Sequence, residues 1–164
     1  MSCLSRWRFE RTRIFPRMSK PVIIAIDHDD YHASHVGTIA DGRQFFLTSP
    51  FIPAIGGSAG REFVALFLFD SRGKFLEARI DDLGTRAQLE LEHVRAAFDK
   101  RFAELGVVRF GRIEVEPFEF TQMGTRFGLV PRPPEDGGED WWVELQPGNY
   151  MAFHEPWDSG EYYT

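Results

Sequence analysis

The chain of 164 residues contains one cysteine, Cys3, which excludes an internal disulfide bond and any multi-cysteine zinc site. An isolated cysteine fits a protein of the reducing cytosol, so a cytoplasmic location is expected. No apolar run approaches the roughly 18–20 residues that a helix needs to cross a bilayer, and we expect no contact with a membrane. Apolar residues make up 43% of the chain, which is enough to build the core of one domain without cross-links.

Basic residues are scarce beyond the N-terminus. Residues 1–17 hold five Arg and one Glu, while the remaining residues hold 14 Lys or Arg against 24 Asp or Glu. The net charge of −6 therefore combines +4 in the first 17 residues with −10 in the rest. An acidic body repels the phosphates of nucleic acid, so we expect no direct nucleic-acid binding. The same charge favours a basic protein partner, or it simply keeps the protein in solution.

The first 17 residues show no core periodicity and lack the uninterrupted apolar segment of a secretory signal. Met18 begins a more ordinary start that leads into an apolar run. We therefore predict that residues 1–17 are a disordered N-terminal extension and that residues 18–164 form a single domain.

The hydrophobic pattern is strongest in residues 61–82 and predicts a β-hairpin in the middle of an antiparallel sheet. Its first strand is apolar on both faces, as in a strand that is covered from above and below. Leu66 and Phe67 should then be buried on opposite faces of the sheet. Residues 70–73 supply a turn, and the returning strand alternates apolar residues with charged ones.

A long amphipathic helix is predicted for residues 85–105. Thr85 and Gln88 have the spacing of a capping box, and Gly106 is placed to end the helix. The apolar positions recur at steps of three or four residues: Ala87, Leu91, Val94, Phe98, Phe102 and Leu105. With the strand patterns before and after it, this predicts an α+β fold, in which an antiparallel sheet of about five to seven strands carries one long helix on one face.

Residues 27–35 bring three histidines beside three aspartates, a set of side chains that suits zinc, iron or manganese. On a strand, His28, Asp30 and His32 would share one face and converge on a metal. The alternative is a polar loop whose side chains bind backbone and water, because no fixed-spacing zinc signature is present. The interpretation without any cofactor is favoured here.

Residues 56–60 spell Gly-Gly-Ser-Ala-Gly, which matches the G-x-S-x-G pattern of a nucleophile elbow. That motif requires a strand before the serine and a helix after it. Prolines precede it here and the central strand follows, so a flexible loop is expected and Ser58 is not expected to act as a nucleophile. Whether the chain is an enzyme remains open at this point, with a non-catalytic role favoured.

The C-terminal part of the chain is acidic and aromatic. From residue 135 onward there are eight acidic residues and no Lys or Arg, together with three of the four tryptophans and three of the four tyrosines. Aromatic rings offer large contact areas and carboxylates can pair with basic side chains, so this segment is a candidate partner-binding surface. Its predicted residues are Glu139, Asp140, Trp142, Glu144, Trp157, Asp158 and Tyr162. Alternation directs Trp141, Val143 and Leu145 inward and leaves Trp142 beside Glu144 on the outer face.

Residues 42–54 (GRQFFLTSPFIPA) and 60–84 (GREFVALFLFDSRGKFLEARIDDLG) resemble bacterial proteins labelled formate hydrogenlyase regulatory protein. The resemblance covers about a third of the chain and includes no catalytic motif. It implies a bacterial cytosolic protein that controls the expression of hydrogenase genes. With no helix-turn-helix pattern and an acidic body, such control would act through a protein partner.

Three functional hypotheses follow from the sequence. The first is a non-catalytic acidic binder, in particular an immunity protein that neutralises a bacterial toxin, since an acidic surface speeds and orients encounters with a basic protein. The second is a regulator of hydrogenase gene expression that acts through a protein partner. The third is a metal-dependent enzyme that uses residues 27–35.

Overall fold

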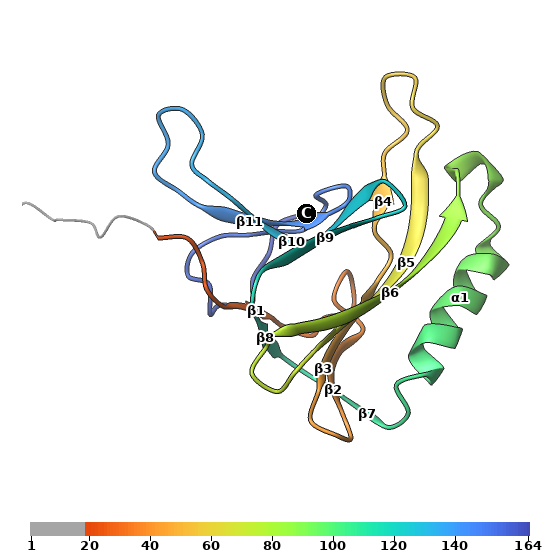
Figure 1. Ribbon diagram of the computed structural model, residues 1–164, viewed down its shortest axis with the longest axis horizontal. Coiled ribbons are helices and arrows are strands. Elements are labelled where there is room, and N and C mark those ends of the chain that lie inside the picture. Colours follow the sequence, from red (N-terminus) through yellow and green to blue (C-terminus); the bar gives the residue numbers. More distant parts are fainter. Residues whose placement is uncertain (1–18) are drawn as a thin grey trace, which may run out of the picture.

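The computed structural model describes residues 19–164, so the predicted extension of residues 1–17 lies outside the described part. This part contains twelve strands, one α-helix and one 3₁₀ turn. Figure 1 shows α1 (Leu91–Ala103) on one side of a large sheet and a second sheet on the other side. The predicted α+β class with a single helix is confirmed.

The largest sheet has six strands and is organised around β5 (Arg61–Phe69). On one side β5 pairs with β6 (Phe75–Gly84), and on the other with β3 (Gln44–Thr48) and β4 (Phe51–Ile52). Beyond β3 lie β2 (Val36–Ile39) and β7 (Val108–Phe110), and every neighbouring pair is antiparallel. The predicted hairpin is confirmed in the place where the sequence puts it.

The two faces of β5 belong to two separate hydrophobic clusters. Phe63, Phe67 and their neighbours of the same parity face the second sheet, while Val64 and Leu66 face the helix. Leu66 and Phe67 are both fully buried, which confirms the prediction of a strand that is covered on both sides. In the helix-side cluster, Phe98 and Phe102 of α1 pack against the sheet.

The helix starts later than its sequence suggested. Thr85 and Gln88 do interact, because the Thr85 hydroxyl donates to Gln88 Oε1, but they begin a 3₁₀ turn (Arg86–Gln88). The chain is extended again at Leu89 and Glu90, and α1 begins only at Leu91. Ala87 and Leu91, which were predicted to face the sheet, are therefore exposed. A capping-box spacing can close one tight turn without nucleating the longer helix.

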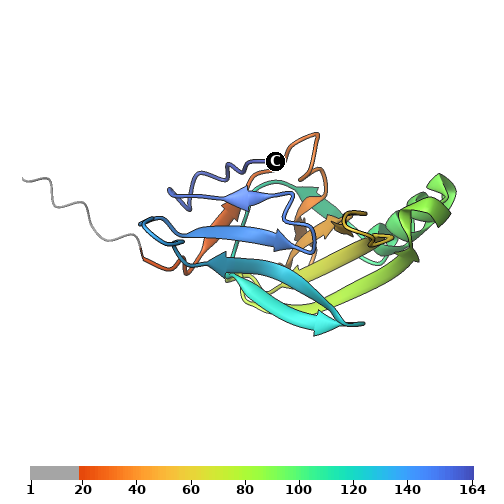
Figure 2. The ribbon, with the colours of Figure 1, turned by 90° about the horizontal axis from the view of Figure 1, so that it is seen from above.

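The second sheet was not predicted as a separate layer. It has the order β12–β11–β10–β9, with bounds β9 (Phe118–Gln122), β10 (Thr125–Arg132), β11 (Trp142–Gln146) and β12 (Ala152–Phe153). Figure 2 shows its strands lying across the larger sheet. Phenylalanine rings fill the space between the sheets. Phe75 stacks on Phe118 with ring centroids 4.3 Å apart, and Phe120 stacks on Phe127 at 5.7 Å.

A two-stranded ribbon completes the domain, with β1 (Ile24–Ile26) paired to β8 (Ile113–Val115). The buried side chain of Gln44 attaches this ribbon to the large sheet. Its amide donates to the carbonyls of Asp70 and Glu114, and its Oε1 accepts from the Glu114 N–H at 3.0 Å. The Gln44 side-chain amide therefore forms the hydrogen bonds that a backbone partner would otherwise form between β3 and β8.

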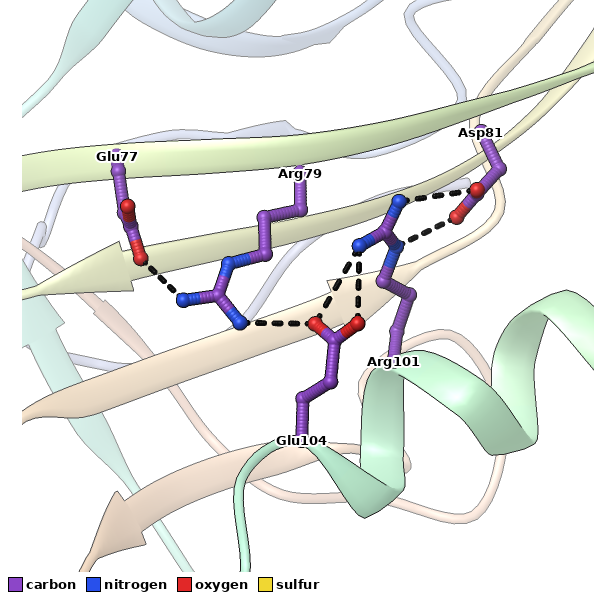
Figure 3. A network of polar contacts seen from close by, with 5 residues as sticks. All are labelled: Glu77, Arg79, Asp81, Arg101 and Glu104. Atoms are coloured by element: carbon purple, nitrogen blue, oxygen red, sulfur yellow. Dashed lines mark hydrogen bonds and ion pairs between the residues drawn. The ribbon is translucent and has the colours of Figure 1, made fainter.

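Five charged side chains attach α1 to the strand β6 (Figure 3). Arg79 of β6 donates to Glu77 and to Glu104, which lies at the end of α1. Arg101 of α1 donates to both carboxylate oxygens of Asp81 and also reaches Glu104. Arg101 is only 14% exposed, so this charge-pair row is better shielded from water than a typical surface ion pair.

Glu104 gives the charge-pair row a pH dependence. Arg79 and Arg101 hold the pKa of Glu104 below its ordinary value, through the hydrogen bond from Arg79 first of all. A carboxyl group whose pKa is lower in the folded than in the unfolded state stabilises the fold at pH values above its unfolded-state pKa. This stabilisation is lost as the pH falls through the folded-state pKa. We therefore expect the Arg79→Gln variant to lose less unfolding free energy than the unmodified protein when the pH falls from about 5 to about 3, as measured by urea denaturation.

Arg95→Gln is the matched control, because it removes the same charge from an exposed position of α1. It should leave the acid dependence of the unfolding free energy unchanged. Identical pH profiles for the two variants would mean that the charge-pair row contributes nothing to acid stability.

The turn of the β5–β6 hairpin rests directly on β8. Gly73 has φ +92°, its carbonyl accepts from the Glu116 N–H at 2.8 Å, and an added Cβ would meet the Glu114 carbonyl and lie 2.8 Å from Val115 Cα. Gly73→Ala should therefore destabilise the protein through both backbone strain and displacement of β8. In Gly42→Ala only the strain applies, because Gly42 has φ +88° and open space around it.

The strain of one left-handed residue costs about 1–2 kcal/mol, which is the loss expected for Gly42→Ala. The unfolding free energy of Gly73→Ala should fall by clearly more than this in the same urea titration. Equal losses in the two variants would show that the turn does not press against β8.

Candidate partner-binding surface

Strand β11 presents the alternation that the sequence predicted. Val143 and Leu145 are fully buried between the sheets, while Trp142 and Glu144 lie on the opposite face of the strand. Trp141 is only half-buried. Trp142 is half-buried as well, so it is less available to a partner than a freely exposed anchor would be.

Glu144 collects three donors: the Trp142 indole N–H, Arg132 Nε and the Gln146 amide, each at 2.9 Å. Burial alone would raise the pKa of Glu144, but these hydrogen bonds outweigh it and keep the pKa below its ordinary value. The carboxylate is therefore already satisfied by its own chain. Trp142 and Glu144 line a hollow with the prolines Pro53, Pro133 and Pro134.

Trp157 and Asp158 line a different hollow, at the ribbon β1–β8. Its volume is about 800 Å³, and we call it the acidic hollow. Its lining comes from three parts of the chain: Ile23, Ala25, Glu114, Glu155, Pro156, Trp157 and Asp158. The Trp157 carbonyl accepts from the Ala25 N–H at 2.8 Å, which fixes the C-terminal segment against β1. Trp157 Nε1 is buried and has no hydrogen-bond partner among residues 19–164.

The charges around the acidic hollow are mostly negative. Glu114, Glu155 and Asp158 line it, and Arg112 lies at its edge, where it approaches Asp27 at 3.3 Å and Glu114 at 3.5 Å. Arg112 also donates to the Asp158 backbone carbonyl. In the described part of the chain, the carboxylates of Glu155 and Asp158 form no ion pair, which leaves both available to an outside cation.

Tyr162 was predicted to be a partner-binding anchor, but the structure shows it holding the C-terminal segment in place. Its hydroxyl donates to Asp29, and its ring contacts Phe153. Burial first, and then the Asp29 carboxylate, raise the pKa of Tyr162. Asp29 also accepts from the backbone N–H groups of Tyr31 and Ala33, so one carboxylate organises the turn that follows β1.

Tyr162→Phe should loosen this segment, because a hydrogen bond to a charged acceptor contributes about 1.5–3 kcal/mol. The matched control is Tyr163→Phe, since Tyr163 is 67% exposed. The Ala152 and Tyr163 backbones bond each other in both directions, so their amide hydrogen exchange reports on local opening. Exchange should accelerate only in Tyr162→Phe; unchanged exchange in that variant would contradict the role of Asp29.

The seven predicted residues do not form a single patch. Trp142 and Glu144 line one hollow, Trp157 and Asp158 line another, and Tyr162 is part of a third contact. Glu139 and Asp140 are exposed in the loop before β11 and line neither hollow. Sequence reasoning missed Ile23, Glu114 and Glu155, because only the pairing of β1 with β8 brings residues 23–25 and 114 to the same place.

Residues 27–35 do not form the strand on which the metal hypothesis depended. They form a loop between β1 and β2, in which His28 bonds the Ser34 carbonyl and stacks on Phe110, while His32 contacts the ring of Tyr150. Asp30 is exposed. Across residues 19–164, no group of three or more His, Cys, Asp or Glu side chains is arranged to hold a metal ion.

The serine of the G-x-S-x-G pattern lies in an exposed loop between β4 and β5. The Ser58 hydroxyl accepts from the Gly60 N–H at 3.2 Å, and a strand rather than a helix follows it. The context that a nucleophile elbow requires is therefore missing around Ser58.

No protein-family model, curated protein or solved structure matches this chain. None of the helices in the described part is long and apolar enough to span a membrane. The function is therefore inferred from the geometry and the charges of the residues themselves.

Proposed function

We propose that this protein is a non-catalytic binding protein for a basic protein partner, with toxin immunity as its specific role. The observation that supports this best is the acidic hollow, in which apolar side chains and carboxylates meet in one depression. The charge of the whole chain supports the immunity role, because toxins that act on nucleic acid present basic surfaces to their substrate.

The acidic hollow suits a lysine or arginine side chain of the partner. Such side chains combine an apolar stem with a charged end, and they bury the stem while the charge stays near water or a counter-ion. Ile23, Pro156 and Trp157 provide apolar surface for the stem. Glu155 and Asp158 provide carboxylates for the charged end, and the Trp157 ring adds cation–π attraction where its face is open.

The wider charge distribution supports the same partner. No Lys or Arg follows residue 134, so the C-terminal segment beside the acidic hollow has no cation of its own. A field of one sign accelerates and orients the approach of an oppositely charged protein. Glu144, by contrast, is already satisfied by three internal donors, so the hollow beside Trp142 contributes less to such recognition.

Regulation of hydrogenase genes through a protein partner is the second candidate, and the resemblance in residues 42–54 and 60–84 favours it. These residues form β3, β4, β5 and β6. They build the scaffold of the large sheet, and none of them lines the acidic hollow. The resemblance therefore concerns the frame of the domain, while the partner would be selected elsewhere.

The test uses the full chain and the protein encoded beside its gene. A neighbouring toxin with a basic domain favours immunity, and neighbouring hydrogenase genes favour the regulator. Glu155→Lys with Asp158→Lys should weaken binding to the basic neighbour at least about tenfold by calorimetry, and the variant should no longer protect cells that express the toxin.

Glu92→Lys with Asp99→Lys is the matched control, since it changes the net charge equally on the exposed side of α1. This control should bind with nearly unchanged affinity, apart from a slower association. Equal losses in both double variants would show that only net charge matters, and unchanged affinity in both would place the interface away from the acidic hollow.

A further inference from the structure

One long strand of the large sheet has an unused edge. Strand β6 has ten residues and pairs only with β5, so its other side is the border of the six-stranded sheet. An open strand edge carries N–H and C=O groups that can accept a further strand. Which groups these are follows from the hydrogen bonds of the neighbouring strands.

The Phe63 N–H donates to the Pro50 carbonyl, so the backbone of the odd-numbered residues of β5 points toward β3 and β4. The Leu47 N–H donates to the His35 carbonyl, so the backbone of Leu47 points away from β5. The backbone of the preceding residue, Phe46, therefore points toward its β5 partner Phe67, which agrees with this assignment. The even-numbered residues of β5 therefore bond β6. Their partners there are Glu77, Arg79 and Asp81.

It follows that Ala78, Ile80 and Asp82 direct their backbone N–H and C=O groups away from the sheet. Within residues 19–164 these groups have no backbone partner on that side. Irregularities in the β5–β6 pairing fall on either side of this run, near Leu76 and Leu83. The regular, open part of the edge is thus the segment from Glu77 to Asp82.

We propose that two copies of this chain pair through this open edge, with the two β6 strands antiparallel and Ile80 at the centre. The proposal does not depend on the partner proposed above. In an antiparallel pair the outward residues must face outward residues. Two registers satisfy this while pairing five of the six residues of the regular segment: one pairs Ile80 with Ile80 of the second copy, and the other pairs Ala78 with Ile80.

Charge decides between the two registers. Pairing Ala78 with Ile80 would set Arg79 opposite Arg79 and Glu77 opposite Asp81, which is repulsive at each position. Pairing Ile80 with Ile80 sets Arg79 opposite the second copy's Asp81, and by symmetry this favourable contact occurs twice. Of these two registers, only the one centred on Ile80 is complementary in charge; centring the pair on Ala78 would also set Glu77 opposite Arg79, but it would pair only three residues of the regular segment.

The same contact extends the charge-pair row of Figure 3. Within one copy the charges alternate along the row from Glu77 through Arg79, Glu104 and Arg101 to Asp81. Asp81 lies at the end of this row, and the second copy's Arg79 would continue the alternation. The two six-stranded sheets would then form one continuous sheet with both helices on the same side.

The first experiment measures the mass of the full chain in solution by sedimentation, in reducing buffer so that Cys3 forms no cross-link. We expect twice the 18.9 kDa of one chain at high concentration, with dissociation on dilution. Ala78→Pro removes an outward N–H that no internal bond uses, so it should give a folded monomer. Ala78→Ser keeps that N–H and should remain dimeric.

The second experiment separates pairing between copies from the charge-pair row within one copy. Arg79→Glu and Asp81→Arg should each weaken association by about tenfold, because like charges then face one another. The double variant restores opposite charges between copies but sets Glu beside Glu104 and Arg beside Arg101 within each copy. It should regain dimerisation although its thermal stability is lowered further.

Amide hydrogen exchange locates the contact. Protection of Ala78 and Ile80 should rise with protein concentration, whereas Arg79, whose N–H faces β5, should be protected at every concentration. A monomer at all concentrations would overturn the proposal. So would a dimer that persists in Ala78→Pro, or a double variant that fails to associate while remaining folded.

Discussion

Strand β5 buries apolar side chains on both of its faces, so each face requires its own cover. Each fully buried aliphatic or phenyl side chain contributes about 1.5–3 kcal/mol of transfer free energy, and seven consecutive residues of β5 are buried. The helix α1 covers one face and the sheet β9–β12 covers the other. The three-layer order follows from this requirement.

The layers differ in how they are attached. Against the helix, Phe98 and Phe102 fill the interface while Arg101 and Glu104 fix the position of α1 above β6. Between the sheets the contact is apolar, with stacked phenylalanine rings beside aliphatic side chains such as Leu129 and Val143. Directional polar bonds thus orient the helix, and apolar packing orients the second sheet.

The sequence was most informative where the pattern is local. The hairpin β5–β6 was predicted because alternation and turn residues are read within a few positions, and so was the outward direction of Trp142 and Glu144. The predicted start of α1 at residue 85 was wrong, because a 3₁₀ turn satisfies the Thr85–Gln88 spacing. The acidic hollow could not be predicted, since Ile23, Glu114 and Trp157 meet only through strand pairing and a carbonyl bond between distant segments.

The division of aromatic residues between core and surface also has an optical consequence. Phenylalanine fills the space between the sheets, whereas Trp141, Trp142 and Trp157 are half-buried, the latter two at the walls of hollows. Indole emission depends on the polarity around the ring, so the intrinsic fluorescence of the described residues reports mainly on these surface depressions. A molecule entering a hollow would therefore change the emission while the layers stay intact.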